Sequence, residues 1–206
     1  MALATADSTQ VRLLDAAEQL IGERGVDGVS LRAINAAAES NVAAAHYHFG
    51  SKATLVRAVL DRRMAVLAEE RSERLAALEH DPSPSPRAVA SVFVTPLFEL
   101  TADQSGARYV RFLAALYRAG HEWRAIADAA FAPQWTLIAP VLARATPRLD
   151  AARRGHRVSL AGETMVRMLA DPDRYAGDLE PGAYCDEVID MFTAIVTGPP
   201  DTQETP

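Results

Sequence analysis

The residues from position 44 to 52, AAHYHFGSK, combine two histidines and a tyrosine with the only lysine of the chain. Histidine can bind metal ions or transfer protons, and tyrosine, histidine and lysine can all donate hydrogen bonds to phosphates. The segment therefore raises three possibilities: a metal site, a catalytic site, or a surface that binds a partner.

The spacing of His46 and His48 argues against a metal site. Residues two apart on a helix point about 200° apart, whereas paired helical zinc ligands are four residues apart. Catalysis lacks support as well, because the segment holds no nucleophile with an orienting acid. The chain has no nucleophile elbow, phosphate-binding glycine loop or HExxH motif. We therefore expect no catalytic residue, metal or cofactor, and a protein that is not an enzyme.

A nucleic-acid-binding surface explains the segment better. The sequence SLRAINAAAESNVAAAHYHF fits a support helix at 30–38, a turn around Glu39 and Ser40, and a recognition helix at 41–48. This is the layout of a helix–turn–helix, in which the second helix enters the major groove. Lys52 begins the next helix, where an ammonium group and the helix N-terminus both attract phosphate.

Individual side chains of this segment suit contacts to DNA. Small alanines at 43–45 let the helix approach base edges, and an alanine methyl can touch a thymine methyl. Asn41 and His46 can hydrogen-bond to bases or phosphates, and Tyr47 and His48 can donate to phosphates. Phe49 is the exception, since it is expected to pack in the core of the small domain.

The surrounding elements are all predicted to be helices. A first amphipathic helix ends at Gly25, and a long helix over 52–79 follows the helix–turn–helix. No segment alternates like a strand, and the clearest loops are at 80–86 and 170–182. Further helices are expected near 86–103, 107–119, 122–145, 152–170 and 182–197. The fold class is therefore all-α, with about nine helices.

The composition sets the class of protein. The 206-residue chain is 49% hydrophobic with a net charge of −6, which suits a soluble globular protein and argues against one that coats nucleic acid non-specifically. Its single cysteine excludes an intrachain disulfide and favours a reducing compartment. The amino-terminal segment lacks signal-peptide features, and the longest apolar run is too short to cross a bilayer. We expect a cytoplasmic protein with no membrane partner.

The sequence resembles the TetR family of bacterial transcriptional regulators. The resemblance is carried by RLLDAAEQLIGERG at 12–25 and YHFGSK at 47–52, within a match over 13–60. It implies an N-terminal three-helix helix–turn–helix DNA-binding domain at 1–51. It also implies a C-terminal helical-bundle ligand-binding and dimerisation domain at 52–206, with helix 52–79 connecting the two.

The resemblance assigns DNA contacts at matching positions. It implies that Ser30 and Lys52 touch phosphate and that Tyr47 and His48 hold the DNA backbone. The residues implied to face base edges are Asn41, Ala43, Ala44 and His46. One position departs from the family pattern, because Glu39 stands where the turn normally has a glycine, which adopts a left-handed backbone without strain.

The family's partners imply a ligand-responsive repressor that binds a palindromic operator in double-stranded DNA as a homodimer, joined through its last two helices. A small effector would release it, and the large aromatic side chains and few arginines beyond the long helix suggest that this effector is mostly apolar and could carry an anionic group, as an acyl-CoA or organic acid does. Candidate lining residues for the effector, each of which could instead belong to the core, are Phe98, Arg111, Phe112, Tyr117, Trp123, Trp135, Met165 and Arg167. Arg167 could also pair with Glu163. The alternative, motivated by Glu39, is a helical small-molecule-binding protein or enzyme that has lost operator binding.

Overall fold

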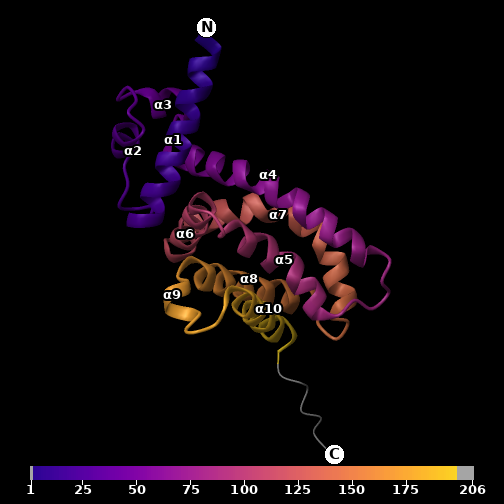
Figure 1. The fold of residues 1–206 in the computed structure, drawn as a ribbon. Coiled ribbons are helices and arrows are strands. Elements are labelled where there is room, and N and C mark those ends of the chain that lie inside the picture. Colours follow the sequence, from indigo (N-terminus) through magenta and orange to yellow (C-terminus); the bar gives the residue numbers. More distant parts are fainter. Residues whose placement is uncertain (1, 199–206) are drawn as a thin grey trace, which may run out of the picture. The chain divides into compact units, whose positions relative to one another are not determined.

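The computed structural model describes residues 2–198, and it describes side chains from residue 9 onward (Figure 1). Over this range the chain forms ten helices and no strand, which confirms the all-α prediction. The helices are α1 (Ala2–Arg24), α2 (Leu31–Ala37), α3 (Ala44–Phe49), α4 (Lys52–Glu79), α5 (Pro86–Leu100), α6 (Gln104–Arg118), α7 (His121–Ala145), α8 (Ala151–Ala170), α9 (Pro172–Tyr175) and α10 (Pro181–Thr197).

The predicted count of about nine helices misses α9, a single turn inside the segment predicted as a loop. Pro172 stands at its first position, where a proline ring presets the helical φ and the missing N–H would have no partner. The N-cap residue, Asp171, makes no capping hydrogen bond through its side chain. Four residues are too few to show helical periodicity, so the sequence pattern cannot reveal such a turn.

The recognition helix begins later than predicted, at Ala44 instead of residue 41. The preceding residues form a turn, in which the Asn41 side-chain oxygen accepts a hydrogen bond from the Ala43 N–H at 3.1 Å. Asparagine competes with the helix in this way because its short side chain can bond its own neighbouring backbone. The long first helix begins at Ala2 and ends at Arg24, directly before the predicted end at Gly25.

One compact unit comprises residues 1–66 and 103–132 and contains the predicted helix–turn–helix. The apolar stripe predicted for the first helix is buried, with Leu13, Ala17 and Ile21 fully inaccessible to solvent. Helix α1 packs closely on α6 at Gly22, where an added Cβ would lie 3.3 Å from the Phe112 backbone nitrogen. The first three helices thus share a core with α4 and α6.

The second compact unit comprises residues 67–102 and 133–206, in which α10 packs against both α5 and α8. Phe93 of α5 stacks on Phe192 of α10, with ring centroids 5.1 Å apart. At the surface Arg87 donates to Asp186 and Asp190, each at 2.7 Å. The inward faces of α8 and α10 lie in the core of the unit, as the buried Met165 and Val188 show. The predicted domain boundary at 51/52 stays a prediction.

By length and composition, α7 is the one described helix that could cross a membrane. Some of its apolar residues serve the cores of the two units, since Ala127 and Ala130 are buried in the first and Ile138 and Leu142 in the second. Core helices of water-soluble proteins pass the same test, so α7 alone does not assign the chain to a membrane.

Candidate nucleic-acid interface

The support helix α2 is held at both ends by side chains. Ser30 is its N-cap, with an extended backbone and a hydroxyl oxygen that accepts from the Ala33 N–H at 3.2 Å. At the other end Arg12 of α1 donates from Nε to the Ala38 carbonyl at 3.1 Å. A cation at a helix C-terminus is favourable because the last carbonyls carry partial negative charge. Both ends of the helix are therefore fixed.

Glu39 forms the turn with a backbone φ of 48°, the only left-handed non-glycine residue among those described. The glutamate thus takes the conformation that glycine provides in the family pattern. The turn continues with hydrogen bonds from the Glu39 N–H to the Ala36 carbonyl at 3.2 Å and from the Ser40 N–H to the Asn35 carbonyl at 3.0 Å. The helix–turn–helix geometry is kept at the cost of local strain.

Asn35 fixes the second helix relative to the first, a role that the sequence analysis did not assign. Its side chain is only 2% exposed. The amide nitrogen donates to the Val42 carbonyl at 2.7 Å, and the amide oxygen accepts from the Ala45 N–H at 2.8 Å. These bonds satisfy backbone groups at the otherwise uncapped start of α3. The sequence feature that could have indicated this role is the single amide side chain, Asn35, among the mostly apolar residues of α2.

The short recognition helix α3 has one buried and one exposed face. Ala45 and Phe49 are buried, as predicted for Phe49. Tyr47 is 84% exposed, and its ring meets the half-buried His48 ring edge-on at 5.2 Å between centroids. His46 is exposed with it. The predicted polar groups are therefore available to a partner outside the protein.

The turn before α3 extends this exposed face. Asn41 and Ala43 are exposed and Ala44 is half-buried. Val42 between them is 73% exposed, which is unusual for a branched apolar side chain. Sequence reasoning did not select Val42, because an isolated valine in a helical pattern indicates core packing.

Lys52 is engaged within the protein. Its ammonium group donates to the carbonyls of Val26 and Val29, at 2.8 and 3.0 Å, and lies 5.1 Å from the centroid of the Trp123 ring. The Trp123 indole N–H in turn donates to Asp27 at 2.9 Å. Carbonyl oxygens thus supply the negative partners that a lysine at a helix N-terminus needs. The predicted phosphate contact of Lys52 stays a prediction.

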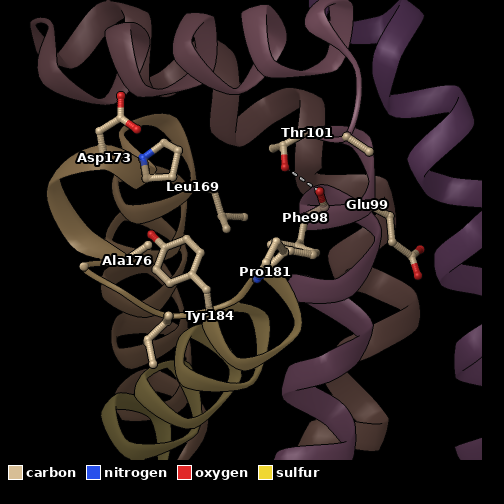
Figure 2. A pocket seen from close by; sticks show the side chains of 12 residues that line it. Phe98, Glu99, Thr101, Leu169, Asp173, Ala176, Pro181 and Tyr184 are labelled. Carbon is tan, nitrogen blue, oxygen red and sulfur yellow. Dashed lines mark hydrogen bonds between the residues drawn. The ribbon is translucent and has the colours of Figure 1, made fainter.

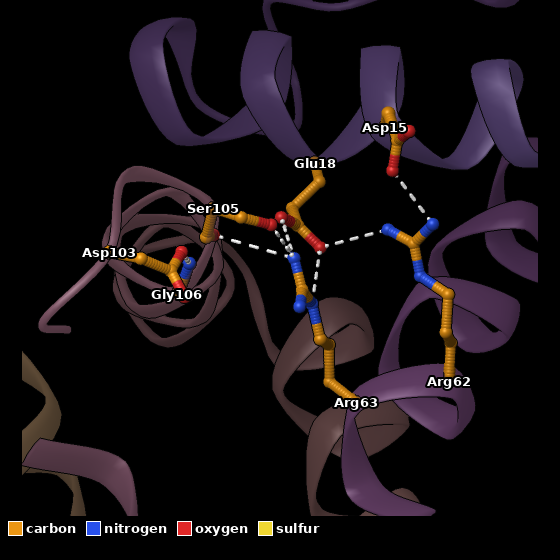
Figure 3. A network of polar contacts seen from close by, with 7 residues as sticks. All are labelled: Asp15, Glu18, Arg62, Arg63, Asp103, Ser105 and Gly106. Atoms are coloured by element: carbon orange, nitrogen blue, oxygen red, sulfur yellow. Dashed lines mark hydrogen bonds and ion pairs between the residues drawn. The ribbon is translucent and has the colours of Figure 1, made fainter. Parts of the chain in front are cut away.

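A charge network centred on the buried Glu18 joins α1, α4 and α6 (Figure 3). Glu18 is 1% exposed and accepts from Arg62 at 3.1 Å and from Arg63 at 2.8 and 3.0 Å. Arg63 also donates to the Ser105 hydroxyl at 2.5 Å. The hydrogen bond to Glu18 raises the pKa of Arg63 above its usual value. Such pairing is required for a carboxylate removed from water.

The eight predicted effector residues divide equally between the two compact units, and their role as one effector site stays a prediction. In the first unit Arg111 is exposed, Phe112 is buried, Tyr117 is half-buried and Trp123 holds Asp27.

In the second unit Met165 is buried and Trp135 half-buried. Arg167 donates to Glu163 at 3.4 Å, the alternative that the sequence left open. Phe98 lines a cavity that belongs to this unit alone (Figure 2). The described residues contain no cluster of three or more histidine, cysteine or acidic side chains suited to a metal ion.

A helix–turn–helix whose second helix exposes its polar face is typical of DNA-binding transcriptional regulators. Residues 13–59 match the family model described as bacterial regulatory proteins, tetR family. Residues 91–198 match the one described as tetracyclin repressor-like, C-terminal domain, which covers more than half of the chain. The chain belongs to the TetR family of bacterial transcriptional regulators. A comparison with curated proteins gave no match.

Solved structures share this fold. NalD of Pseudomonas aeruginosa, the secondary repressor of the MexAB-OprM multidrug efflux pump, is 22% identical with a TM-score of 0.63, over 90% of this chain and 97% of NalD. FadR of Bacillus subtilis, solved with stearoyl-CoA, is 15% identical with a TM-score of 0.61, over 89% and 97%. PfmR of Thermus thermophilus is 21% identical with a TM-score of 0.58, over 91% and 98%.

Proposed function

We propose that this regulator is a repressor that binds a palindromic operator as a homodimer and is released by a small, mostly apolar effector. The observation that carries the DNA-binding part is the exposed face of α3, which Asn35 holds by hydrogen bonds to both the turn and the helix. A rigidly positioned short helix with a bare polar face suits insertion into the major groove. A cytoplasmic location follows from this function.

The contacts divide between base edges and phosphates. We assign Asn41, Ala43, Ala44 and His46 to base edges. The Asn41 side-chain oxygen is engaged by the Ala43 N–H, so its amide nitrogen is the group left to donate to a base acceptor. The exposed Val42 joins this group, because an apolar side chain suits a thymine methyl. Phosphate contacts fall to Ser30, Tyr47, His48 and Lys52.

The Tyr47 contact is tested by removing its hydroxyl. An operator would first be selected from a random duplex pool, and binding measured by fluorescence anisotropy. We expect Tyr47→Phe to weaken binding by about tenfold, because one hydrogen bond to a charged phosphate contributes about 1.5 kcal/mol. Tyr175→Phe is the matched control, since Tyr175 is an exposed tyrosine in the other compact unit. Equal binding by wild type and Tyr47→Phe would contradict the assignment of Tyr47 to a phosphate contact.

The Lys52 contact has a separate signature, which is the salt dependence of binding. A lysine that neutralises one phosphate adds about 0.9 to the slope of log affinity against log salt. Lys52→Gln should therefore lower that slope by about this amount, with folding checked by circular dichroism because Lys52 also holds the carbonyls of residues 26 and 29. An unchanged slope in a folded variant would assign Lys52 to structure alone.

The homodimer is supported by apolar side chains left exposed on the last two long helices. Leu160 of α8 is 50% exposed and Met191 of α10 is 40% exposed. A second copy of the chain would bury both in a helix–helix interface.

The alternative of a protein that has lost operator binding rested on Glu39. Glu39 adopts the left-handed backbone of the turn, so its backbone conformation does not favour that alternative. Failure to enrich any sequence from the random pool, together with turnover of a bound small molecule, would favour it.

A further inference from the structure

The second compact unit contains a cavity of about 710 Å³, formed where α5 and α8 end and α10 begins (Figure 2). Its wall is mainly apolar, with Phe98 from α5, Leu169 from α8, and Leu179 from the segment before α10. Tyr184 of α10 forms one side, and its hydroxyl donates to the Met168 carbonyl at 2.8 Å. The volume lies within the range of small-molecule sites.

The charged side chains that line this cavity are acidic. The charged residues among its described lining are Glu99 and Asp173, and the lining includes no lysine, arginine or histidine. The carbonyl ends of α5 and α8 add partial negative charge. The start of α10 offers little compensation, because its first residue is Pro181, which has no N–H, and its N-cap residue is the acidic Glu180, whose side chain makes no capping hydrogen bond.

The two acidic side chains that line the cavity are not equivalent. Glu99 is already paired with Arg74 at 2.6 Å. Asp173 is exposed, and the structure gives its carboxylate no ion-pair partner among the described residues. In the same region, burial, with Asp171 as a second cause, raises the pKa of Tyr184 to about 12, in keeping with a negative local potential. Asp173 is thus the carboxylate available to a ligand.

We propose that this cavity binds an amphipathic organic cation, with its apolar body against Phe98, Leu169 and Tyr184 and its charged group beside Asp173. An anion of the same size would meet the unpaired carboxylate of Asp173 and two helix C-termini, and the described lining offers it no basic side chain. The inference rests on the proposed function in one respect, namely that this cation is the effector that releases the operator.

Two probes of nearly the same size and shape but opposite charge test the ligand class. Binding of tetraphenylphosphonium and of tetraphenylborate would be measured by isothermal titration calorimetry on the full chain. We expect the cation to bind more tightly by about tenfold or more, since a difference of about 1.4 kcal/mol is tenfold in affinity. Equal or tighter binding of the borate would overturn the proposal.

Two variants with matched controls test the location. Ala176→Phe fills the cavity from its lining and should abolish cation binding, whereas Ala183→Phe, on the exposed start of α10 outside the lining, should not. Asp173→Asn should lower the affinity for the cation by about threefold, as expected for one solvent-exposed charge. Asp178→Asn, in the same segment, should leave this affinity unchanged. Retained binding in a folded Ala176→Phe variant would place the site elsewhere.

Operator release separates the two proposals. Release by the phosphonium from wild type, but not from Ala176→Phe, supports the site and its effector role together. Binding without release keeps the cation site and contradicts its role as effector. Release by another compound that is unaffected in Ala176→Phe keeps the ligand-responsive repressor and contradicts this cavity as the effector site.

Discussion

Glu39 carries the main local strain of the helix–turn–helix. Its φ of 48° brings the Cβ of an L-residue close to the following carbonyl, which costs about 1–2 kcal/mol. The turn keeps this conformation because hydrogen bonds and the packing of α2 and α3 hold the backbone on either side.

Replacing Glu39 with glycine should relieve that strain. We expect Glu39→Gly to raise the free energy of unfolding by about 0.5–1 kcal/mol, because the relief exceeds the added entropy of glycine in the unfolded chain. Urea denaturation followed by circular dichroism gives the value. Glu39→Ala is the control, since it removes the charge but keeps Cβ, and a gain equal to that of glycine would contradict the strain explanation.

Between elements, the polar network centred on Glu18 connects α1 to α4 and α6. Arg62 illustrates how exposure changes the value of a charge pair, because it binds both the buried Glu18 and Asp15, whose side chain is 56% exposed. Buried pairs are costly to break on one side, whereas exposed pairs contribute little.

Glu18→Gln should lower the free energy of unfolding by about 3 kcal/mol, because two arginines then lose their buried counter-charge. Asp15→Asn, which removes the exposed partner of the same arginine, should lower it by less than about 1 kcal/mol. Both values come from urea denaturation. Similar losses in the two variants would show that burial does not set the value of this network.

The start of α6 provides a pH-dependent contribution. Asp103 is its N-cap and accepts from the Gly106 N–H at 2.9 Å, a hydrogen bond that lowers the pKa of Asp103 below its usual value. Because folding lowers this pKa, the ionised carboxylate stabilises the fold above its unfolded-state pKa of about 4. That contribution is lost as the pH falls through the lower folded-state pKa.

Asp103→Asn should therefore flatten the decline of unfolding free energy below about pH 4. The asparagine can still cap α6 but cannot titrate. Denaturation series between neutral and acidic pH measure the slope, with Asp178→Asn, which caps no described helix, as the control. A slope equal to that of wild type in Asp103→Asn would exclude this carboxylate as a source of acid sensitivity.

At the scale of the whole molecule, the proposed function requires two copies of the chain. Each recognition helix is short, and residues 1–60 contain more acidic than basic side chains, so a single copy has little non-specific attraction to DNA. Joining two copies makes the second half-site contact intramolecular and raises the overall affinity.

Leu160→Arg should separate the dimer by placing a charge in the proposed interface. Sedimentation should show half the wild-type mass, and operator affinity should fall by about 100-fold as the two half-sites cease to act together. Leu137→Arg is the control, because Leu137 is 57% exposed on α7, outside the last two helices. A monomer produced by Leu137→Arg, with Leu160→Arg still dimeric, would move the interface to α7.

The local sequence pattern was sufficient to predict much of the secondary structure of this protein. Helical periodicity predicted the all-α class, Gly25 marked the end of the first helix, and the YHFGSK segment predicted the buried Phe49. These features depend on residues within a few positions of one another, so they are recorded in the order of the amino acids. The single turn α9 was not predicted, because four residues are too few to show helical periodicity.

Only the tertiary structure decided which distant groups meet. It engaged Lys52 with the carbonyls of residues 26 and 29, buried Glu18 between two arginines of α4, and left Asp173 beside an apolar cavity with no ion-pair partner among the described residues. Each outcome depends on how helices far apart in the chain pack together. Packing sets distance, burial and dielectric, and these decide whether a charged side chain binds a neighbour, supports the core or remains available to a ligand.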